Sequence, residues 1–282
     1  MNKHLDTLNY KQLVNIFAES NKDVIKAYNN LKKDIIQLAK QCVKVIKKNG
    51  RIFYVGAGSS GRIALLDALD ILPTFGELNW FKYSMAGGDA AILASLEGYE
   101  DDYNLGYCDA KKENINNKDL IIGLSASGNT KYIKGFFVYA KTTNAKTTLI
   151  ANQKNGDCES VSDDVIVGDV GKEVISGSTR LKAATLQKLI LNTISSITAI
   201  KLGKVYDDLM IDLIPKNEKL VKRSIDILKQ ITHISALDAQ KLYSEADQNI
   251  KVAAVMHLNK VDKINAIKLL KKSHNNLREV IG

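Results

Sequence analysis

The sequence predicts an α/β fold: a doubly wound parallel sheet, with helices before it and a small helical subdomain after it. Apolar runs typical of buried strands alternate with segments of helical periodicity, and these runs are 52–55, 80–85, 120–124, 147–151 and 165–167. In addition, hydroxyl-rich loops follow two of the runs. Such loops are expected where parallel strands end at one edge of a sheet and a ligand binds there.

Length and composition limit the class of protein. The 282 residues suffice for one large α/β domain and a small appendage. The net charge of +9 comes from dispersed lysines interleaved with Asp and Glu, so we expect most of them on solvated faces, a remaining fraction that helps attract a phosphorylated substrate, and no nucleic-acid partner. Cys42, Cys108 and Cys158 indicate neither a disulfide framework nor a zinc site. Since no signal-peptide layout and no run of about 18 apolar residues occurs, we expect a cytoplasmic protein without a membrane partner.

We predict three parts in the chain: a helical lead-in over 1–41, the α/β domain over 42–205 and a helical subdomain over 216–282. Apolar residues recur at three- and four-residue steps in the lead-in, and Gly50 ends its last helix. Pro73 is expected to end the helix that follows the first strand. The tail contains five short helical segments and no strand; the segments are 220–230, 236–246, 250–259, 263–270 and 276–281.

The loop after the first strand reads Gly56-Ala-Gly-Ser-Ser-Gly61 and opens a helix. Glycines let backbone N–H groups turn toward an anion, the helix N-terminus adds partial positive charge, and serine hydroxyls donate hydrogen bonds. A dinucleotide site would need a carboxylate after the next strand, which instead ends in Ala86-Gly87-Gly88. We therefore predict that Gly58, Ser59 and Ser60 bind a phosphate group rather than NAD.

A second loop of the same chemistry, Ser125-Ala-Ser-Gly-Asn-Thr130, follows the third strand. Two hydroxyl-rich loops suit a single phosphate on a small molecule, and the predicted binding residues of this loop are Ser125, Ser127, Asn129 and Thr130. Before the long helix within 173–205, Ser176, Ser178 and Thr179 suit either helix capping or ligand contact. Arg180 and Lys182 suit either anion contact or surface charge.

The order of six motifs is particular: Tyr54-Val-Gly-Ala-Gly-Ser-Ser-Gly-Arg62, Pro73-Thr-Phe-Gly76, Ala86-Gly-Gly-Asp89, Glu97-Gly-Tyr-Glu-Asp101, Ser125-Ala-Ser-Gly-Asn-Thr130 and Ser176-Gly-Ser-Thr-Arg-Leu-Lys-Ala183. Through them the chain resembles the N-acetylmuramic acid 6-phosphate etherases over nearly its whole length. The resemblance implies a sugar isomerase (SIS) domain, which is a flavodoxin-like α/β/α sandwich, and a homodimer with sites near the subunit interface. It implies no metal or other cofactor. The glucokinase regulatory protein shares this architecture without being an etherase.

The resemblance also implies the reaction: cleavage of the D-lactyl ether of N-acetylmuramic acid 6-phosphate to N-acetylglucosamine 6-phosphate and D-lactate, in amino sugar catabolism and peptidoglycan recycling. Two catalytic glutamates of the family align with Glu100 and with Asp70, whose side chain is one methylene shorter. Glu100 would be the base at C2 of the open-chain aldehyde and Asp70 the acid at the ether oxygen. Lys219, in a matched Asn-Glu-Lys-Leu, would contact substrate. Asn152-Gln-Lys154 replaces the family's Cys-Asn-Pro.

Two other functions remain open from the sequence. Intact phosphate loops beside an altered acid position also suit a non-catalytic sugar-phosphate sensor or regulator. An aldose–ketose isomerase on the same fold fits less well, because the tail and the Glu-Gly-Tyr-Glu motif match the etherases. The histidines lie outside all of the motifs, so we expect them to be structural or exposed; they are His4, His233, His257 and His274.

Overall fold

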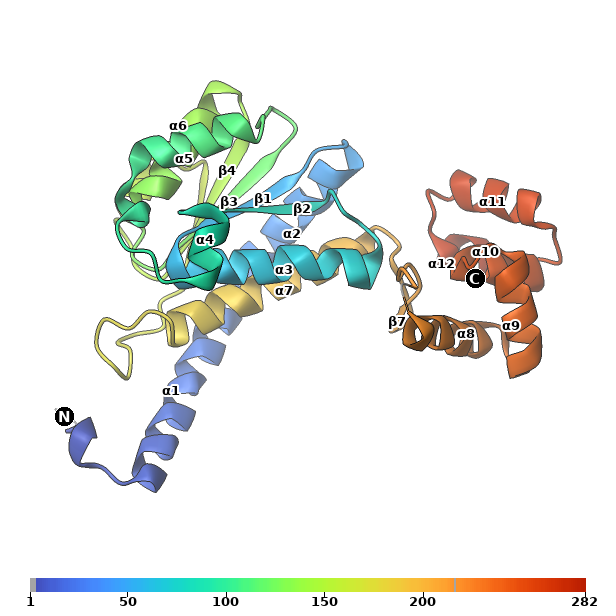
Figure 1. Ribbon diagram of the computed structural model, residues 1–282, viewed down its shortest axis with the longest axis horizontal. Coiled ribbons are helices and arrows are strands. Elements are labelled where there is room, and N and C mark those ends of the chain that lie inside the picture. Colours follow the sequence, from blue (N-terminus) through green and yellow to red (C-terminus); the bar gives the residue numbers. More distant parts are fainter. Residues whose placement is uncertain (1–3, 216) are drawn as a thin grey trace. The chain divides into compact units, whose positions relative to one another are not determined.

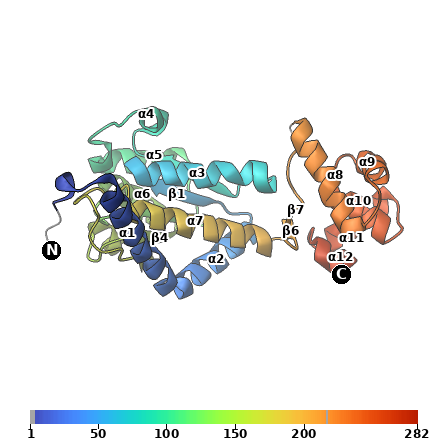
Figure 2. The ribbon, with the colours of Figure 1, turned by 90° about the horizontal axis from the view of Figure 1, so that it is seen from below.

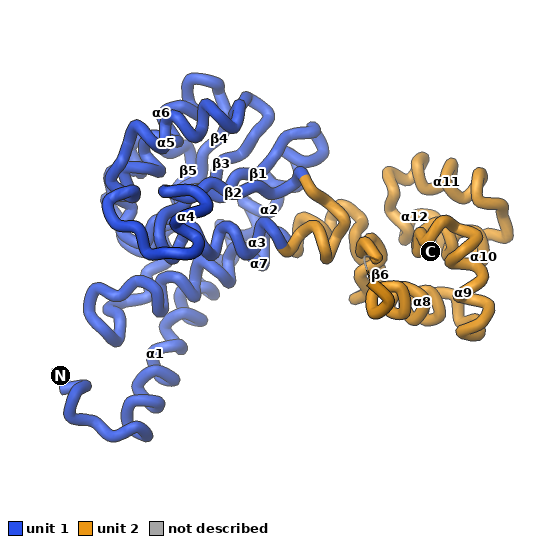
Figure 3. The backbone as a smooth tube through the Cα atoms, in the orientation of Figure 1, with its two compact units in different colours: residues 1–69, 79–195 blue, residues 70–78, 196–282 orange. Residues whose placement is uncertain are grey.

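The computed structural model describes residues 4–215 and 217–282, which form two compact units (Figure 3). The first unit comprises residues 1–69 and 79–195, and the second comprises residues 70–78 and 196–282. Within the described ranges, no helix is long and apolar enough to cross a membrane. The same ranges contain no cluster of His, Cys, Asp and Glu that could hold a metal ion.

A five-stranded parallel sheet forms the centre of the first unit, with the strand order β2-β1-β3-β4-β5. Its strands are β1 (Ile52–Gly56), β2 (Phe81–Met85), β3 (Leu120–Ser125), β4 (Lys146–Ala151) and β5 (Asp164–Val167). The chain winds outward from β1 to β2 on one side and from β3 to β5 on the other. The winding therefore reverses between β1 and β3, which confirms the predicted doubly wound sheet.

Helices cover both faces of the sheet (Figures 1 and 2). One layer is made by α5 (Tyr103–Lys112) and α6 (Lys131–Thr142), and the other by α2 (Lys32–Lys47), α3 (Gly58–Phe75) and α7 (Lys182–Lys201). Every residue of β1 and β3 is buried, because side chains on each face of the sheet meet a helical layer. Shorter or outlying elements are η1 (Leu5–Thr7), α1 (Tyr10–Asn30), α4 (Gly88–Leu93), η2 (Tyr99–Asp101) and η3 (Asp157–Val161).

The helix α3 runs through Pro73, so the predicted end of this helix was wrong. A proline removes one backbone donor, but near a helix end this leaves one carbonyl without its partner and does not stop the next turn. The Thr74 hydroxyl donates to the Asp70 carbonyl at 2.6 Å, and Gly76 N–H donates to the Leu72 carbonyl at 3.0 Å. These two bonds close the last turn beyond the proline.

Helices make up most of the second unit, and the five helical segments predicted for the tail are present. They are α8 (Glu218–Thr232), α9 (Ala236–Glu245), α10 (Ile250–Leu258), α11 (Lys263–Lys272) and α12 (Leu277–Ile281), preceded by the antiparallel pair β6 (Val205–Tyr206) and β7 (Leu209–Met210). Buried Lys251 of α10 donates to Asp212 Oδ2 at 2.6 Å and to the Asn275 carbonyl at 2.9 Å. Burial lowers the pKa of Lys251 despite the neighbouring Asp212 carboxylate.

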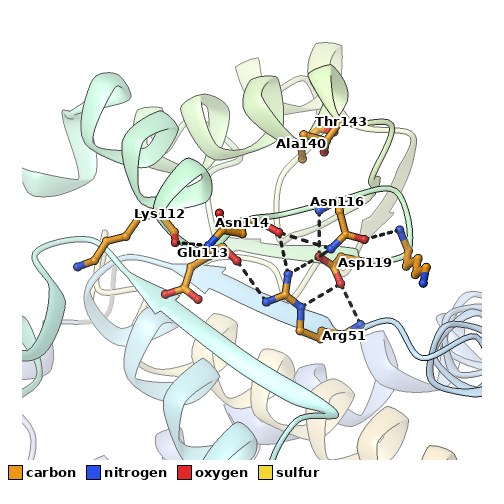
Figure 4. Close-up of polar contacts among 9 residues, drawn as sticks. Arg51, Lys112, Glu113, Asn114, Asn116, Asp119, Ala140 and Thr143 are labelled. Atoms are coloured by element: carbon orange, nitrogen blue, oxygen red, sulfur yellow. Dashed lines mark hydrogen bonds and ion pairs between the residues drawn. The ribbon is translucent and has the colours of Figure 1, made fainter.

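An ion pair between a partly exposed arginine and a buried carboxylate connects the residues just before β1 and β3 (Figure 4). Asp119, only 2% exposed, accepts hydrogen bonds from Arg51 N at 3.0 Å, Nε at 3.2 Å and Nη2 at 2.7 Å. It also accepts two bonds from Asn116, both at 3.1 Å. The guanidinium donates in turn to the carbonyls of Glu113 and Asn114. Both oxygens of the Asp119 carboxylate thus accept hydrogen bonds from protein groups.

Replacement of this carboxylate is expected to destabilise the first unit. Asp119→Ala should lower the free energy of unfolding by about 2–4 kcal/mol, because the partly exposed Arg51 charge and several N–H groups lose their acceptor. Urea denaturation measures the change. Asp208→Ala, at an exposed acid of the second unit, is the control and should change stability by less than about 0.5 kcal/mol. Equal effects of the two substitutions would contradict the assignment.

Candidate functional site

Two loops meet at the carboxyl edge of the sheet, where the winding reverses. We name residues 57–61 the β1 loop and residues 125–130 the β3 loop. In the parallel pair of β1 and β3, Gly56 lies opposite Leu124, so the two loops leave the sheet side by side. The β1 loop leads into α3 and the β3 loop into α6, and each helix therefore begins at this edge. The structure brings the two predicted binding loops together.

Internal hydrogen bonds order the β3 loop. Buried Ser125 Oγ accepts from Gly128 N at 3.0 Å and lies 2.8 Å from Thr130 Oγ1. Gly128 has a φ of 75°, and a Cβ on Gly156 would lie 2.6 Å from its Cα, so two loop backbones touch here. Thr130 precedes α6 without a side-chain capping bond, so the first N–H groups of α6 keep their capacity to bind an anion.

Two exposed residues of the β3 loop, Ser127 and Asn129, have side-chain hydrogen-bond donors that can bind another acceptor. Ser127 Oγ accepts from Asn129 N at 3.2 Å, which leaves its hydroxyl proton for another acceptor. The Asn129 side-chain oxygen accepts a hydrogen bond from Asp157 N at 2.8 Å. The two N–H groups of the Asn129 amide can therefore donate to another acceptor. Both side chains are exposed. The β3 loop thus combines an internally bonded floor with outward hydroxyl and amide donors.

The β1 loop forms the first turn of α3, and its two serines differ. Ser60 Oγ donates to Gln187 Oε1 at 2.8 Å, and Gln187, on α7, is only 1% exposed. Ser59 has no hydrogen bond from its hydroxyl within the part of the chain that the structure describes. Ser60 therefore links the loop to α7, whereas the Ser59 hydroxyl donates to no residue that the structure describes.

The network continues through Asn152, in the segment that departs from the family pattern. Gln187 Nε2 lies 3.5 Å from Asn152 Oδ1, and Asn152 Nδ2 donates to the Gly168 carbonyl at 2.9 Å. Asn152 is 7% exposed, so its amide is a buried group that needs these partners. Asn152, which differs from the family pattern, thus extends the hydrogen-bond network of Ser60 and Gln187 to the Gly168 carbonyl. Sequence reasoning missed Gln187, because a single glutamine in an apolar helix carries no distinctive signal.

Glu100 lies beside the β1 loop. It lines a small pocket together with Gly58, Arg62, Tyr99 and Ala86, and its side chain is exposed. The Arg62 guanidinium donates to the carbonyls at the end of α4, at 2.8 Å, 2.9 Å and 3.4 Å. It therefore anchors the segment that carries Glu100 to α3. Arg62 is the last residue of the motif Tyr54–Arg62, and the sequence predicted no role for it.

The other two predicted site residues belong to the second unit. Asp70 is exposed on α3, three turns after the β1 loop. Lys219 is exposed in the first turn of α8, which Asn217 caps by accepting from Leu220 N at 3.0 Å. The roles of Asp70 and Lys219 stay predictions.

A carboxylate, not a hydroxyl, caps α7. Glu173 accepts from Lys182 N at 3.1 Å and from Ala183 N at 2.9 Å, which satisfies two of the free N–H groups of the helix. The capping role considered for Ser176, Ser178 and Thr179 is thus filled by another residue. The Lys182 ammonium is buried and pairs with Asp23 at 2.8 Å, so it is an internal charge.

Two buried groups near the β3 loop are held protonated. Burial raises the pKa of the Cys158 thiol to about 11, and its Sγ lies 3.3 Å from the Thr130 carbonyl. Burial also raises the pKa of Tyr132, whose hydroxyl donates to Asp109 Oδ2 at 2.7 Å. At neutral pH neither the Cys158 thiol nor the Tyr132 hydroxyl carries a charge.

Comparison with known proteins identifies the family. The chain is 39% identical over 280 residues to an N-acetylmuramic acid 6-phosphate etherase of Staphylococcus epidermidis, with 99% of this chain and 95% of the relative covered. It is 41% identical to one from Francisella philomiragia, with 96% and 93% covered. The chain belongs to the N-acetylmuramic acid 6-phosphate etherase family. The resemblance in the motifs is therefore confirmed over the full chain.

Two further comparisons concern the fold of this etherase-family chain. Residues 34–141 match the model of the glucokinase regulatory protein N-terminal SIS domain. A phosphoheptose isomerase from Francisella tularensis superposes with a TM-score of 0.55 at 22% identity, covering 68% of this chain and 100% of the other. This likeness concerns the fold alone and confirms the SIS architecture.

Proposed function

We propose that this protein is a lyase that cleaves the D-lactyl ether of N-acetylmuramic acid 6-phosphate, giving N-acetylglucosamine 6-phosphate and D-lactate. The observation that carries the proposal is near full-length identity of 39% and 41% to proteins named as this etherase. The pocket that holds Glu100 beside the β1 loop supports it. The reaction would serve amino sugar catabolism and peptidoglycan recycling. It would run in the cytoplasm, because a phosphorylated sugar does not cross a membrane unaided.

The two loops would hold the phosphate and sugar hydroxyls. The first N–H groups of α3 and α6 and the hydroxyl of Ser59 suit a phosphate, since helix N-termini and neutral donors stabilise an anion. Ser127 and Asn129 supply outward donors at the rim, and Gly58 lines the pocket with Glu100. Ser60, Ser125 and Thr130 would act by fixing these loops as well as by contact. Lys219 would add a cation.

An ether is cleaved more easily by elimination than by displacement, because its leaving group is a basic alkoxide. In the open-chain aldehyde, Glu100 would take the proton from C2, whose carbanion the carbonyl stabilises. The C3–O bond then breaks as Asp70 protonates the lactate oxygen. Water adds to the resulting unsaturated aldehyde at C3, and a proton returns to C2. Atoms and charge balance without a cofactor, and the two carboxyl groups need opposite protonation states.

Removal of the proposed base is expected to stop turnover without preventing binding. Glu100→Gln should lower kcat for D-lactate release about 10²–10⁴-fold, the usual contribution of general base catalysis. Calorimetry should show that the variant still binds N-acetylglucosamine 6-phosphate. Glu97→Gln, at an exposed acid outside the pocket, is the matched control. Full activity of Glu100→Gln would exclude this assignment, and binding without any turnover by the native protein would favour the regulator.

Restoration of the family's longer acid is expected to speed the reaction. Asp70→Glu should raise kcat several-fold, up to about 10-fold, because placement of the acid at the ether oxygen controls its efficiency. Asp70→Asn should lower kcat by about 10²-fold. Steady-state D-lactate release measures both. If Asp70→Glu and Asp70→Asn both turn over at the native rate, Asp70 is not the acid.

We further propose a homodimer. On α1, Val14 is 66% and Ile25 54% exposed, and on α3, Leu66 is 49% and Leu69 55% exposed. Apolar side chains in such numbers on two helices suit burial against a second subunit. A second subunit on the α3 face would lie close to Asp70, which neighbours Leu69 in the chain.

The mass in solution tests the dimer. Sedimentation velocity should give twice the chain mass of 31.1 kDa, and Leu69→Glu should shift the protein to monomer, because a charge cannot be buried without a partner. Leu237→Glu, at a leucine of α9 that is 64% exposed, is the control and should leave the dimer unchanged. A native monomer at micromolar concentration would contradict the proposal.

A further inference from the structure

A second concave site lies at the opposite, amino edge of the sheet. We name it the lysine pocket; its volume is about 660 Å³ and it is lined by Gln37, Lys40, Gln41, Lys44, Val45, Lys48, Asn117, Lys118, Asp119, Leu120, Lys146 and Asp164. Leu120, Lys146 and Asp164 are the first residues of β3, β4 and β5, and α2 forms the facing wall. All of these residues belong to the first unit. The size suits a small-molecule ligand.

The charge of the lysine pocket is one-sided. None of its five lysines forms an ion pair with a residue that the structure describes. The Asp119 carboxylate accepts hydrogen bonds from Arg51 and Asn116, as Figure 4 shows, so it does not neutralise the five lysines. Asp164 accepts from Gln41 Nε2 at 3.0 Å and is the remaining acid of the lining. The pocket therefore gathers an excess of positive charge.

This arrangement is not explained by helix stability. Lys40, Lys44 and Lys48 stand at four-residue steps along α2 and its end, where like charges repel. Lysines near a helix C-terminus do interact with its dipole, but this reason does not extend to Lys118 and Lys146, which precede or begin strands. Positive charges from α2, from Lys118 and from Lys146 thus line one pocket, where they repel one another. A bound anion would remove this repulsion.

The walls of the pocket are rigid. A Cβ on Gly50 would lie 2.1 Å from the Lys118 carbonyl oxygen, so the backbone that carries Lys118 is pressed against the chain just after α2. The Arg51–Asp119 pair holds the same segment from the other side, and Lys146 N donates to the Asp119 carbonyl at 3.3 Å. Fixed backbones at both strand starts give a preformed site, and preorganisation favours affinity.

We propose that the lysine pocket binds a small anion with two or more phosphate groups, of the pyrophosphate or nucleoside diphosphate class. A single phosphate contacts two or three ammonium groups, whereas a diphosphate spans lysines from separate segments. Val45 and Leu120 supply apolar surface, and no aromatic side chain lines the pocket for base stacking. The phosphate chain is therefore the part that is recognised. This inference does not depend on the proposed reaction.

Calorimetry at low ionic strength tests the proposal with inorganic pyrophosphate and tripolyphosphate. Saturating N-acetylglucosamine 6-phosphate is present throughout, so that the carboxyl-edge loops are blocked. The native protein should bind one equivalent, and tripolyphosphate should bind more tightly. The triple substitution Lys44→Gln, Lys118→Gln and Lys146→Gln should weaken binding by about 30-fold or more, since each charge-assisted contact contributes severalfold.

The control is a second triple substitution that removes the same number of positive charges outside the pocket. Lys47, Lys112 and Lys141 are exposed on α2, α5 and α6 and do not line the pocket, so Lys47→Gln, Lys112→Gln and Lys141→Gln should change affinity less than about threefold. Equal losses in the two triples would show diffuse surface attraction and overturn the proposal. So would the absence of saturable binding, or displacement of tripolyphosphate by a much tighter-binding short oligonucleotide.

Discussion

The parallel pairing of β1 with β3 is the constraint on which the candidate site depends. From these neighbouring strands the chain departs toward β2 on one side and β4 on the other, so the loops that follow them diverge above the same edge. The N-termini of α3 and α6 therefore lie at the same edge, and each contributes partial positive charge there. The sheet can take this order because both of its faces are covered by helices, which makes its central strands apolar throughout.

At that edge, internal hydrogen bonds occupy some of the polar side chains and leave donors on others. Ser125 holds the turn of the β3 loop, and Ser60 ties the β1 loop to the buried Gln187. Half-buried Ser59 and exposed Asn129 keep hydrogen-bond donors that no residue within the described part of the chain accepts. A loop whose own hydrogen bonds are already made loses little entropy on binding, and this supports the proposal that the two loops hold a phosphate.

The first unit uses its arginines and lysines differently. Arg51, just before β1, donates several hydrogen bonds to Asp119 and to backbone carbonyls, and Arg62, on α3, donates to carbonyls at the end of α4. Their planar guanidinium groups suit such multiple, fixed acceptors. The pocket lysines at the amino edge instead form no ion pair with any residue that the structure describes. The β3 loop at the carboxyl edge therefore presents hydroxyl and amide donors, whereas five lysines gather at the opposite edge.

The sequence by itself determined the fold class, the two hydroxyl-rich loops and the family, because strand and helix periods and motif order are local properties of the chain. It misjudged Pro73, since a proline near a helix end removes only one bond and tertiary contacts decide where the helix stops. Tertiary structure alone decided that Gln187 supports the β1 loop, that Arg62 anchors the end of α4, and that lysines from three segments meet in one pocket. Those contacts join residues far apart in sequence, and no local pattern encodes which side chains a fold will bring together.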